Sequence, residues 1–193
     1  MFEHIIRYLE GLIAQYGAMG VFLATIVEEI VAPIPSPFIP LSAGFLMFPS
    51  EAGFLGVAGG SLLYIALPVA LGLSLGSIAV YGVGFWGGKK IIDRFGHLFG
   101  FSWSDVERVE SRVTAGSRDE IGIFILRLLP IVPGVAVSGF CGVVRYPFLK
   151  FFSITFVGSF LRAFFLGLFG WRVGIVYDTY ADAITRGEKY ILL

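Results

Sequence analysis

One stretch of the sequence, from Ala52 to Gly88, carries no charged side chain and constrains the fold more than any other feature. As a helix rising 1.5 Å per residue it would be about 55 Å long, whereas the hydrocarbon core of a bilayer is about 30 Å thick. A second uncharged run extends from Leu128 to Val144. Charged residues make up only 15% of the 193 residues, against about a quarter in soluble domains. The sequence therefore predicts an all-α integral membrane protein with one membrane domain.

The first apolar region is interrupted by EEIVAPIPSPFIPLSAGFL, residues 28–46, which places two carboxylates and four prolines within an apolar pattern. The arms on either side have about 11 to 14 residues, too few for a crossing of about 20 residues. Proline removes a backbone donor and ends or kinks a helix. We therefore expect a re-entrant hairpin with Pro33, Pro35 and Gly44 as hairpin-breaking residues. In the long uncharged run, Pro68 is expected to kink the helix or end one segment.

The pattern returns in RLLPIVPGVAVSGFCGVVRYP, residues 127–147. A shift of 98 residues carries Pro35 onto Pro133 and Gly44 onto Gly142, and the same shift carries Gly72 onto Gly170 and Gly76 onto Gly174. A second hairpin is therefore predicted, with Pro130, Pro133 and Gly142 as its hairpin-breaking residues. Because each unit combines a re-entrant hairpin with one crossing helix, two such units must face opposite ways. This predicts an inverted repeat, as in transporters.

The expected organisation follows from these units and from the charge distribution. Six Lys and Arg residues lie between 89 and 118, and none lies between Arg7 and Lys89, so the positive-inside rule predicts a cytoplasmic loop. The predicted segments are an amphipathic helix over 1–16, repeat 1 over 17–88, a cytoplasmic loop with a surface helix over 89–119, repeat 2 over 120–176 and a tail over 177–193. The expected location is the inner or plasma membrane, with several passes.

The shift of 98 residues also places Glu29 opposite Arg127, so the two repeats carry opposite charges at equivalent positions. An ionised side chain at the bilayer centre costs about 2.5–3.5 kcal/mol on insertion scales, so such residues pair, face the protein interior or contact a polar ligand. We expect Glu29 and Arg127 to pair where the hairpin tips meet. The competing interpretation is that the two charges only lock the hairpins together, or reach the membrane surface.

Two further charged residues are candidates for the same site. Glu28 precedes Glu29, but the shift matches it with Leu126, so Glu29 is favoured as the inward-facing acid. Arg162 lies within the last predicted crossing, where it serves either as an interfacial anchor or as a binding group for a phosphate headgroup.

Other classes of function lack their signatures. The histidines, His4 and His97, lie outside the apolar segments, and no His, Cys and carboxylate cluster has the spacing of metal ligands. We therefore predict no enzymatic activity, no metal and no cofactor. A net charge of zero without a basic cluster argues against a nucleic-acid partner. Cys141, the single cysteine, is expected to pack as a small buried residue.

The hairpin sequences resemble the DedA family, whose shared region is also called the VTT or SNARE-associated domain, from about Gly17 to Gly174. EEIVAPIPSPFIPLSAGFL is similar to the family's acidic residue followed by Pro-x-Pro-Ser and Ala-Gly. RLLPIVPGVAVSGFCGVVRYPFLKF is similar to its Arg-x-x-Pro, glycine and aromatic sequence, and YGVGFWGGKK to its Gly-Tyr-x-x-Gly-Arg segment, with Lys89 in place of arginine.

The resemblance implies two opposed re-entrant hairpins and lipid translocation of the flippase or scramblase type. The implied substrate is a polyprenyl phosphate carrier such as undecaprenyl phosphate, or a phospholipid, recognised through its phosphate headgroup. Glu29 and Arg127 stand where the family has a functional carboxylate and arginine, and Ser36 is the serine of Pro-x-Pro-Ser. Many members carry an acid at the position of Pro37 and an arginine at that of Pro133. These departures weaken the expectation of proton coupling.

Two other functions compete with lipid translocation. The intramembrane carboxylate also fits a proton-coupled transporter of a small ion or drug. The second competing function is a scaffold that transports nothing, in which the hairpins serve only as packing elements. A homo-oligomer and the placement of the termini are left open by the sequence.

Overall fold

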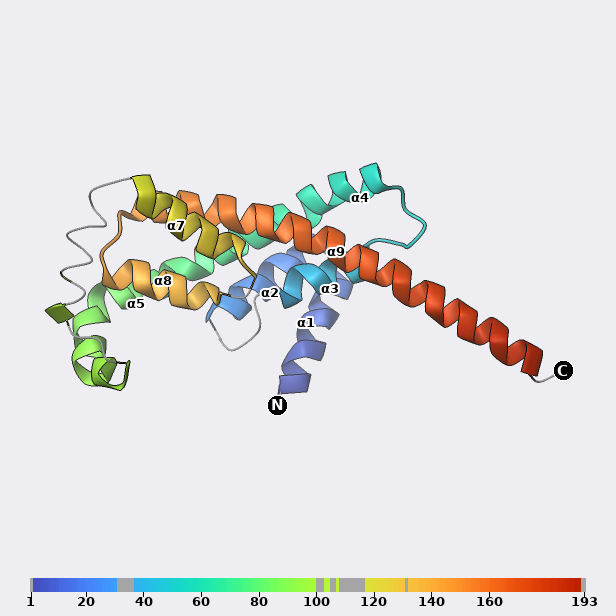
Figure 1. Cartoon of the computed structure of the whole chain (residues 1–193), viewed down its shortest axis with the longest axis horizontal. Helices are drawn as coiled ribbons and strands as arrows, with labels where there is room; N and C mark the ends of the chain where they lie inside the picture. The colour runs from blue at the N-terminus through green and yellow to red at the C-terminus, as the bar shows by residue number, and fades with distance from the viewer. Residues whose placement is uncertain are drawn as a thin grey trace.

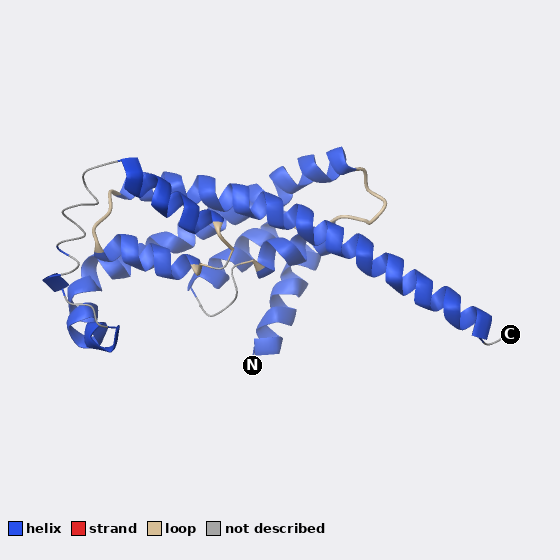
Figure 2. Cartoon of the chain, viewed as in Figure 1, coloured by secondary structure: helices blue, strands red, loops and turns tan. Residues whose placement is uncertain are grey.

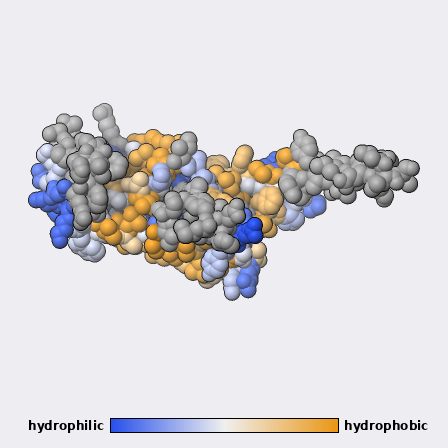
Figure 3. All heavy atoms as spheres, turned by 90° about the horizontal axis from the view of Figure 1, so that it is seen from below, coloured by the Kyte–Doolittle hydropathy of each residue, from blue (hydrophilic) through white to orange (hydrophobic). Residues whose placement is uncertain are grey.

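The computed structural model of the chain describes residues 2–30, 37–99, 103–104, 107, 117–130 and 132–191. Helices are the regular elements throughout these residues (Figures 1 and 2), which confirms the all-α class. Two helical stretches, Phe54–Lys90 and Phe148–Val176, are long and apolar enough to cross a membrane. On the face shown in Figure 3, hydrophobic residues cover much of the coloured middle, and hydrophilic residues gather at the left end and in further groups at the lower edge. This distribution suits a bundle surrounded by lipid along its middle.

The N-terminal part forms three short helices: α1 (Phe2–Tyr16), α2 (Ala18–Ile30) and α3 (Phe38–Met47). Gly17 connects α1 to α2 with φ of 55°, a left-handed conformation that glycine adopts without strain. Leu9 and Ile13 of α1 are buried and Tyr8 is exposed, as an amphipathic helix requires. The range 31–36 between α2 and α3 lies outside the described residues, so the predicted breaks at Pro33 and Pro35 and the position of Ser36 have no structural description.

The first long helical stretch consists of α4 (Phe54–Ser61), η1 (Leu62–Ala66) and α5 (Leu67–Phe99), which follow one another without interruption. Pro68 neither ends this helix nor separates two segments. Instead the π-helical turn η1 directly precedes it, and the Leu67 amide hydrogen-bonds to the Leu62 carbonyl five residues back. A wider turn relieves the conflict between a proline ring and the carbonyl four residues before it.

The second half repeats this order with α7 (Ser117–Leu128), α8 (Gly134–Val143) and α9 (Phe148–Ile191). Asp119 and Glu120 occupy the first turn of α7 and Arg127 its last turn, which complements the helix dipole. Pro130 follows the end of α7, and Pro133 is the N-cap of α8. The helix α9 continues through residues 177–191, the range expected as a tail. The predicted surface helix of the loop lies mostly outside the described residues.

The short helices pack crosswise on the two long helices: α3 lies on α9 and α8 lies on α5, while α2 packs on α5 and α7 on α9. Figure 1 shows α5 and α9 extending along the long axis of the bundle with the short helices beside them. Gly44 is in contact with the backbone of Gly167, and Gly142 with the backbone of Tyr81. Both glycines lie inside helices, so their prediction as hairpin-breaking residues is wrong: they lack a Cβ because another helix touches them there.

The glycines of the two long helices do not correspond by an unbroken shift of 98 residues. A Cβ on Gly76 would approach the Glu29 Cβ of α2 to 3.0 Å, whereas a Cβ on Gly174 would approach the Phe45 side chain of α3 to 3.4 Å. Gly76 and Gly174 therefore face different helices, and the ungapped extension of the repeat into the crossing helices is wrong.

Two apolar clusters hold the bundle together. One joins α1, α2, α3 and η1 to α9 around Ile39 and Ala163, and the other joins α5, α7 and α8 to α9 around Val137 and Phe151. The arms α2, α7 and α8 and the helices α5 and α9 meet between these clusters. The charged residues predicted from the sequence lie at this meeting point.

Candidate functional site

Among the residues whose side chains the structure describes, four charged ones are buried inside the bundle, each at most 5% exposed: Glu28 and Glu29 at the end of α2, Arg127 at the end of α7, and Arg162 in α9. Glu28 and Glu29 both attract Arg162, and Glu29 also attracts Arg127. The two acids and two arginines compensate each other in charge. Burial of one of them alone would be far more costly than burial of the group.

Glu29 and Arg127 form the buried ion pair that the sequence predicts. The Glu29 Oε1 atom lies 3.9 Å from Arg127 Nη1, a distance at which electrostatic attraction acts without a direct hydrogen bond. The guanidinium also stands over the ring of Phe151, with its central carbon 5.5 Å from the ring centroid. Arg127 is therefore held by an acid from α2 and by an aromatic ring from α9.

Ser138 of α8 links the two charges and was missed by the sequence analysis. Its hydroxyl accepts a hydrogen bond from Arg127 Nη2 at 2.8 Å and lies 2.7 Å from Glu29 Oε1, to which it donates. The Gly134 carbonyl, 3.0 Å away, is an alternative acceptor for the same proton, and it accepts from Arg127 Nη1 at 3.3 Å. A signal existed: Ser138 is the only hydroxyl residue in the apolar run from Leu128 to Val144.

Three glycines from three helices make room for this network. A Cβ on Gly134 of α8 would lie 2.6 Å from Glu29 Oε2, and one on Gly158 of α9 would lie 2.8 Å from the Arg127 Cβ. Gly76 of α5 is similarly close to the Glu29 Cβ. The site is therefore built so tightly that alanine at Gly134 would collide with the ion pair.

The network leaves binding capacity unused. Among the residues that the structure describes, Arg127 Nε and Arg162 Nε have no hydrogen-bond partner although both are buried. A buried guanidinium nitrogen without an acceptor is costly in an apolar setting. Both arginines can therefore donate a further hydrogen bond to an oxygen that enters the site.

Cys141 is fully buried in α8 and packs in the cluster that contains Tyr81 and Val137, as the sequence predicts for a packing residue. Within the described part of the chain, no group of three His, Cys, Asp or Glu side chains could hold a metal ion.

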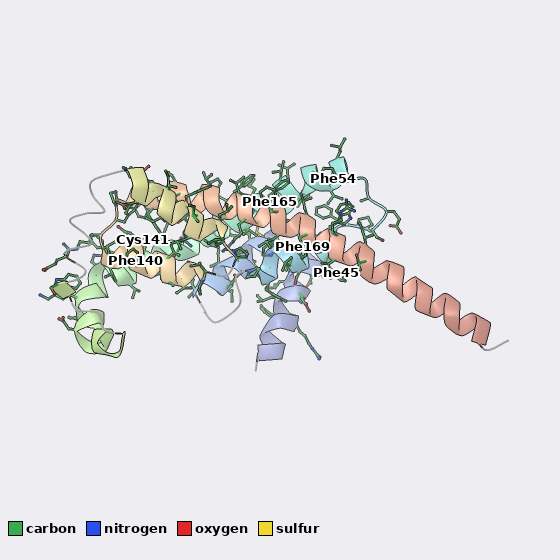
Figure 4. The ribbon with its side chains drawn as sticks, viewed as in Figure 1. Phe45, Phe54, Phe140, Cys141, Phe165 and Phe169 are labelled. Atoms are coloured by element: carbon green, nitrogen blue, oxygen red, sulfur yellow. The ribbon has the colours of Figure 1, made fainter. Side chains whose placement is uncertain are left out.

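An apolar cavity of about 480 Å³ lies apart from the ion pair, where α1 meets α3 and α9. Its lining includes Glu10, Ser42, Phe45 and Phe169, and Figure 4 shows Phe45 and Phe169 on the two helices that meet there. None of the four buried charges lines this cavity, so we place the candidate functional site at Glu29, Ser138 and Arg127.

These features define a class: helical membrane proteins in which short apolar arms pack against two long membrane-capable helices around an enclosed ion pair. The sequence model of the VTT domain matches residues 48–172, which is more than half of the chain. The chain therefore belongs to the VTT domain family, the DedA family indicated by its hairpin motifs.

Curated relatives agree with a membrane protein of this family. The chain is 28% identical to the uncharacterized membrane protein slr0232 of Synechocystis sp. over 151 residues, which cover 78% of this chain and 64% of that relative. It is 25% identical to undecaprenyl phosphate transporter A of Bacillus subtilis, covering 83% of this chain and 69% of the relative. A Lactococcus lactis protein named alkaline phosphatase-like is also 25% identical, with coverage of 93% and 81%. No solved structure matches the chain.

Proposed function

We propose that this protein moves an amphiphilic lipid with a phosphate headgroup across the cell membrane. The first substrate to test is a polyprenyl phosphate such as undecaprenyl phosphate, and the second is a phospholipid. The observation that carries the proposal is the buried network in which Arg127 is held by Glu29 and Ser138. The similarity to undecaprenyl phosphate transporter A supports the choice of substrate.

In the proposed mechanism, Arg127 binds the phosphate while the acyl or prenyl chains stay in the bilayer. Guanidinium binds phosphate through forked hydrogen bonds, and Arg127 already directs its two terminal nitrogens to Ser138 and Gly134. Glu29 competes with phosphate for the same cation. Release of the lipid restores the Glu29 and Arg127 pair, so the empty site keeps no uncompensated charge.

We further propose that the two hairpins are related as an inverted repeat. A shift of 98 residues carries α2 onto 116–128, and α7 spans Ser117–Leu128. Each second arm packs on the long helix of the other repeat, α3 on α9 and α8 on α5. Crosswise packing of this kind supports a two-fold relation between the halves.

Close contacts of single glycines support the same relation. Gly170 of α9 touches the backbone of Leu41 in α3, and Gly84 of α5 approaches the backbone of Gly139 in α8. Leu41 and Gly139 are 98 residues apart, whereas Gly84 and Gly170 are 86 apart. The short helices of the two halves thus correspond at a spacing of 98 residues and the long helices at a spacing of 86 residues. An alignment of the two halves therefore needs a gap before the long helices.

The experiment that tests the proposed function uses purified protein in lipid vesicles. A fluorescent phosphate lipid is placed in both leaflets, and a membrane-impermeant quencher reports how much reaches the outer leaflet. Protein-dependent quenching of the inner pool supports lipid translocation. Vesicles that quench no faster with protein than without it would refute it.

A proton-coupled carrier of a small ion or drug is the second candidate, because the buried carboxylate of Glu29 suits proton exchange. The same vesicles distinguish the two functions. Solute flux driven by a pH gradient, without lipid movement, would favour the carrier.

We propose that the protein is a transporter and not an enzyme, and the similarity to undecaprenyl phosphate transporter A supports this proposal. A scaffold that transports nothing makes a different prediction. It would retain full biological activity when Glu29 and Arg127 are both replaced by glutamine.

A further inference from the structure

A row of polar side chains on α9 makes no hydrogen bond to Glu29, Ser138 or Arg127 that the structure shows. Thr155 and Ser159 are fully buried and Arg162 is almost fully buried. Positions that differ by three or four residues lie on the same face of a helix, so these three side chains share one face. The neighbouring Gly158 touches Arg127 of α7, which brings this part of α9 to the ion pair.

The hydroxyls of this face are unpartnered within the part of the chain that the structure describes. Neither Thr155 Oγ1 nor Ser159 Oγ has a hydrogen-bond partner, and Arg162 Nε has none either. A buried helical hydroxyl usually bonds to the carbonyl of the preceding turn, as Thr25 does with Val21 at 2.8 Å. Thr155 and Ser159 do not make this bond, so their hydroxyls stay available for another group.

Unpartnered hydroxyls are costly in a buried, apolar setting, and methyl groups of the same shape would stabilise the bundle better. They occur together with an arginine that also lacks an acceptor for its Nε atom. Two hydroxyl donors and a guanidinium on one face match the oxygens of a phosphate group. An apolar ligand group would leave these donors unsatisfied.

We propose that Thr155, Ser159 and Arg162 form an α9 wall that binds the phosphate group of an anionic ligand held on its other side by Arg127. The inference rests on the proposed function for the choice of a lipid phosphate. The chemistry itself is shared by a lipid headgroup and by free phosphate. A phosphate placed there satisfies donors from α7 and α9 at once, which orients the headgroup rather than only attracting it.

The test compares Thr155→Val and Ser159→Ala with controls that remove hydroxyls already bonded to the backbone. The control for Thr155→Val is Thr25→Val, and the control for Ser159→Ala is Ser77→Ala, because Ser77 is also fully buried and bonds to the Ser74 carbonyl. Binding of dodecyl phosphate and of inorganic phosphate to the full chain in detergent is measured by titration. The melting temperature without ligand is measured in parallel.

We expect Thr155→Val and Ser159→Ala each to weaken dodecyl phosphate binding about tenfold, the effect of one hydrogen bond to a charged group. Their melting temperatures without ligand should stay equal to the parent's or rise. Thr155→Ser, which keeps the hydroxyl, should bind like the parent. Both control variants should melt at lower temperature and bind with unchanged affinity.

Parental affinity in both Thr155→Val and Ser159→Ala would overturn the α9 wall, and so would a parent that binds neither probe. If the two variants bind inorganic phosphate more weakly but bind dodecyl phosphate like the parent, free phosphate is the ligand and the proposed role of the α9 wall stands. Failure of the proposed function gives a separate result: the parent binds phosphate through these residues but moves no lipid in vesicles. Lipid movement with unaltered binding in both variants would keep the function and reject the wall.

Discussion

Replacing Ser138 with alanine tests whether the hydroxyl holds the buried charges together. The variant loses the bond from Arg127 Nη2 at 2.8 Å and the bond to Glu29 Oε1 at 2.7 Å. Each bond to a charged partner contributes about 1.5–3 kcal/mol. Without the Ser138 hydroxyl, Glu29 and Arg127, which are 3.9 Å apart, can move into direct contact and regain part of the lost interaction energy. The net loss in free energy of unfolding should therefore be about 2 kcal/mol.

The assay is reversible unfolding in mixed micelles, followed by the loss of helical circular dichroism. Ser77→Ala is the matched control, because Ser77 is equally buried in a helix but its hydroxyl bonds only to a neutral backbone carbonyl. Its expected loss is about 0.5–1.5 kcal/mol. Equal losses in both variants would refute the argument, since they would show that the bridge between Glu29 and Arg127 adds nothing beyond an ordinary hydroxyl bond.

Three further predictions address the same site. Gly158→Ala should destabilise the protein by about 1–3 kcal/mol in the same unfolding assay, because the new Cβ would lie 2.8 Å from the Arg127 Cβ. Gly122→Ala is the control: its Cβ would have no atom within 4 Å, so this variant should be more stable by about 0.5–1 kcal/mol. Glu29→Gln alone should lower the free energy of unfolding by about 3–5 kcal/mol, and the double variant with Arg127→Gln should lose less than the sum of the two single losses. Additive losses would show that the two side chains do not interact. Lower pH should strengthen dodecyl phosphate binding in titrations, because protonated Glu29 no longer competes with the phosphate for Arg127. The pH dependence of binding should be smaller in Glu29→Gln. Equal pH dependence in the parent and in Glu29→Gln would count against competition between Glu29 and phosphate.

The sequence predicted the parts of the fold that depend on local pattern. The spacing of Leu9 and Ile13 predicted a helix with one buried face, and the charges at Glu29 and Arg127 predicted a buried pair because lone charges are costly in lipid. The helix prediction depends on one short segment, whereas the pair prediction depends on the return of a local pattern 98 residues later, which placed Glu29 opposite Arg127.

The remaining features depend on packing between segments far apart in the chain. Gly44 and Gly142 were grouped with the prolines as hairpin-breaking residues, yet each is a contact point of one helix with another. Ser138 gains its role from α2 and α7, which the order of residues in α8 does not reveal. The helix does not end at Pro68, as one of the two predicted alternatives had it, because a π-helical turn before a proline depends on geometry that local propensity does not show.

If Arg127 takes part in moving a phosphate lipid, replacing it should stop lipid movement in vesicles. Vesicles containing parent, Arg127→Ala or Arg172→Ala protein are loaded with a fluorescent polyprenyl phosphate, and quenching from outside is followed over time. Arg172 is the control because it is an exposed arginine of α9 stacked on Trp171. We predict that the parent and Arg172→Ala expose the inner lipid pool and that Arg127→Ala does not. Equal quenching with Arg127→Ala and with the parent would contradict the account.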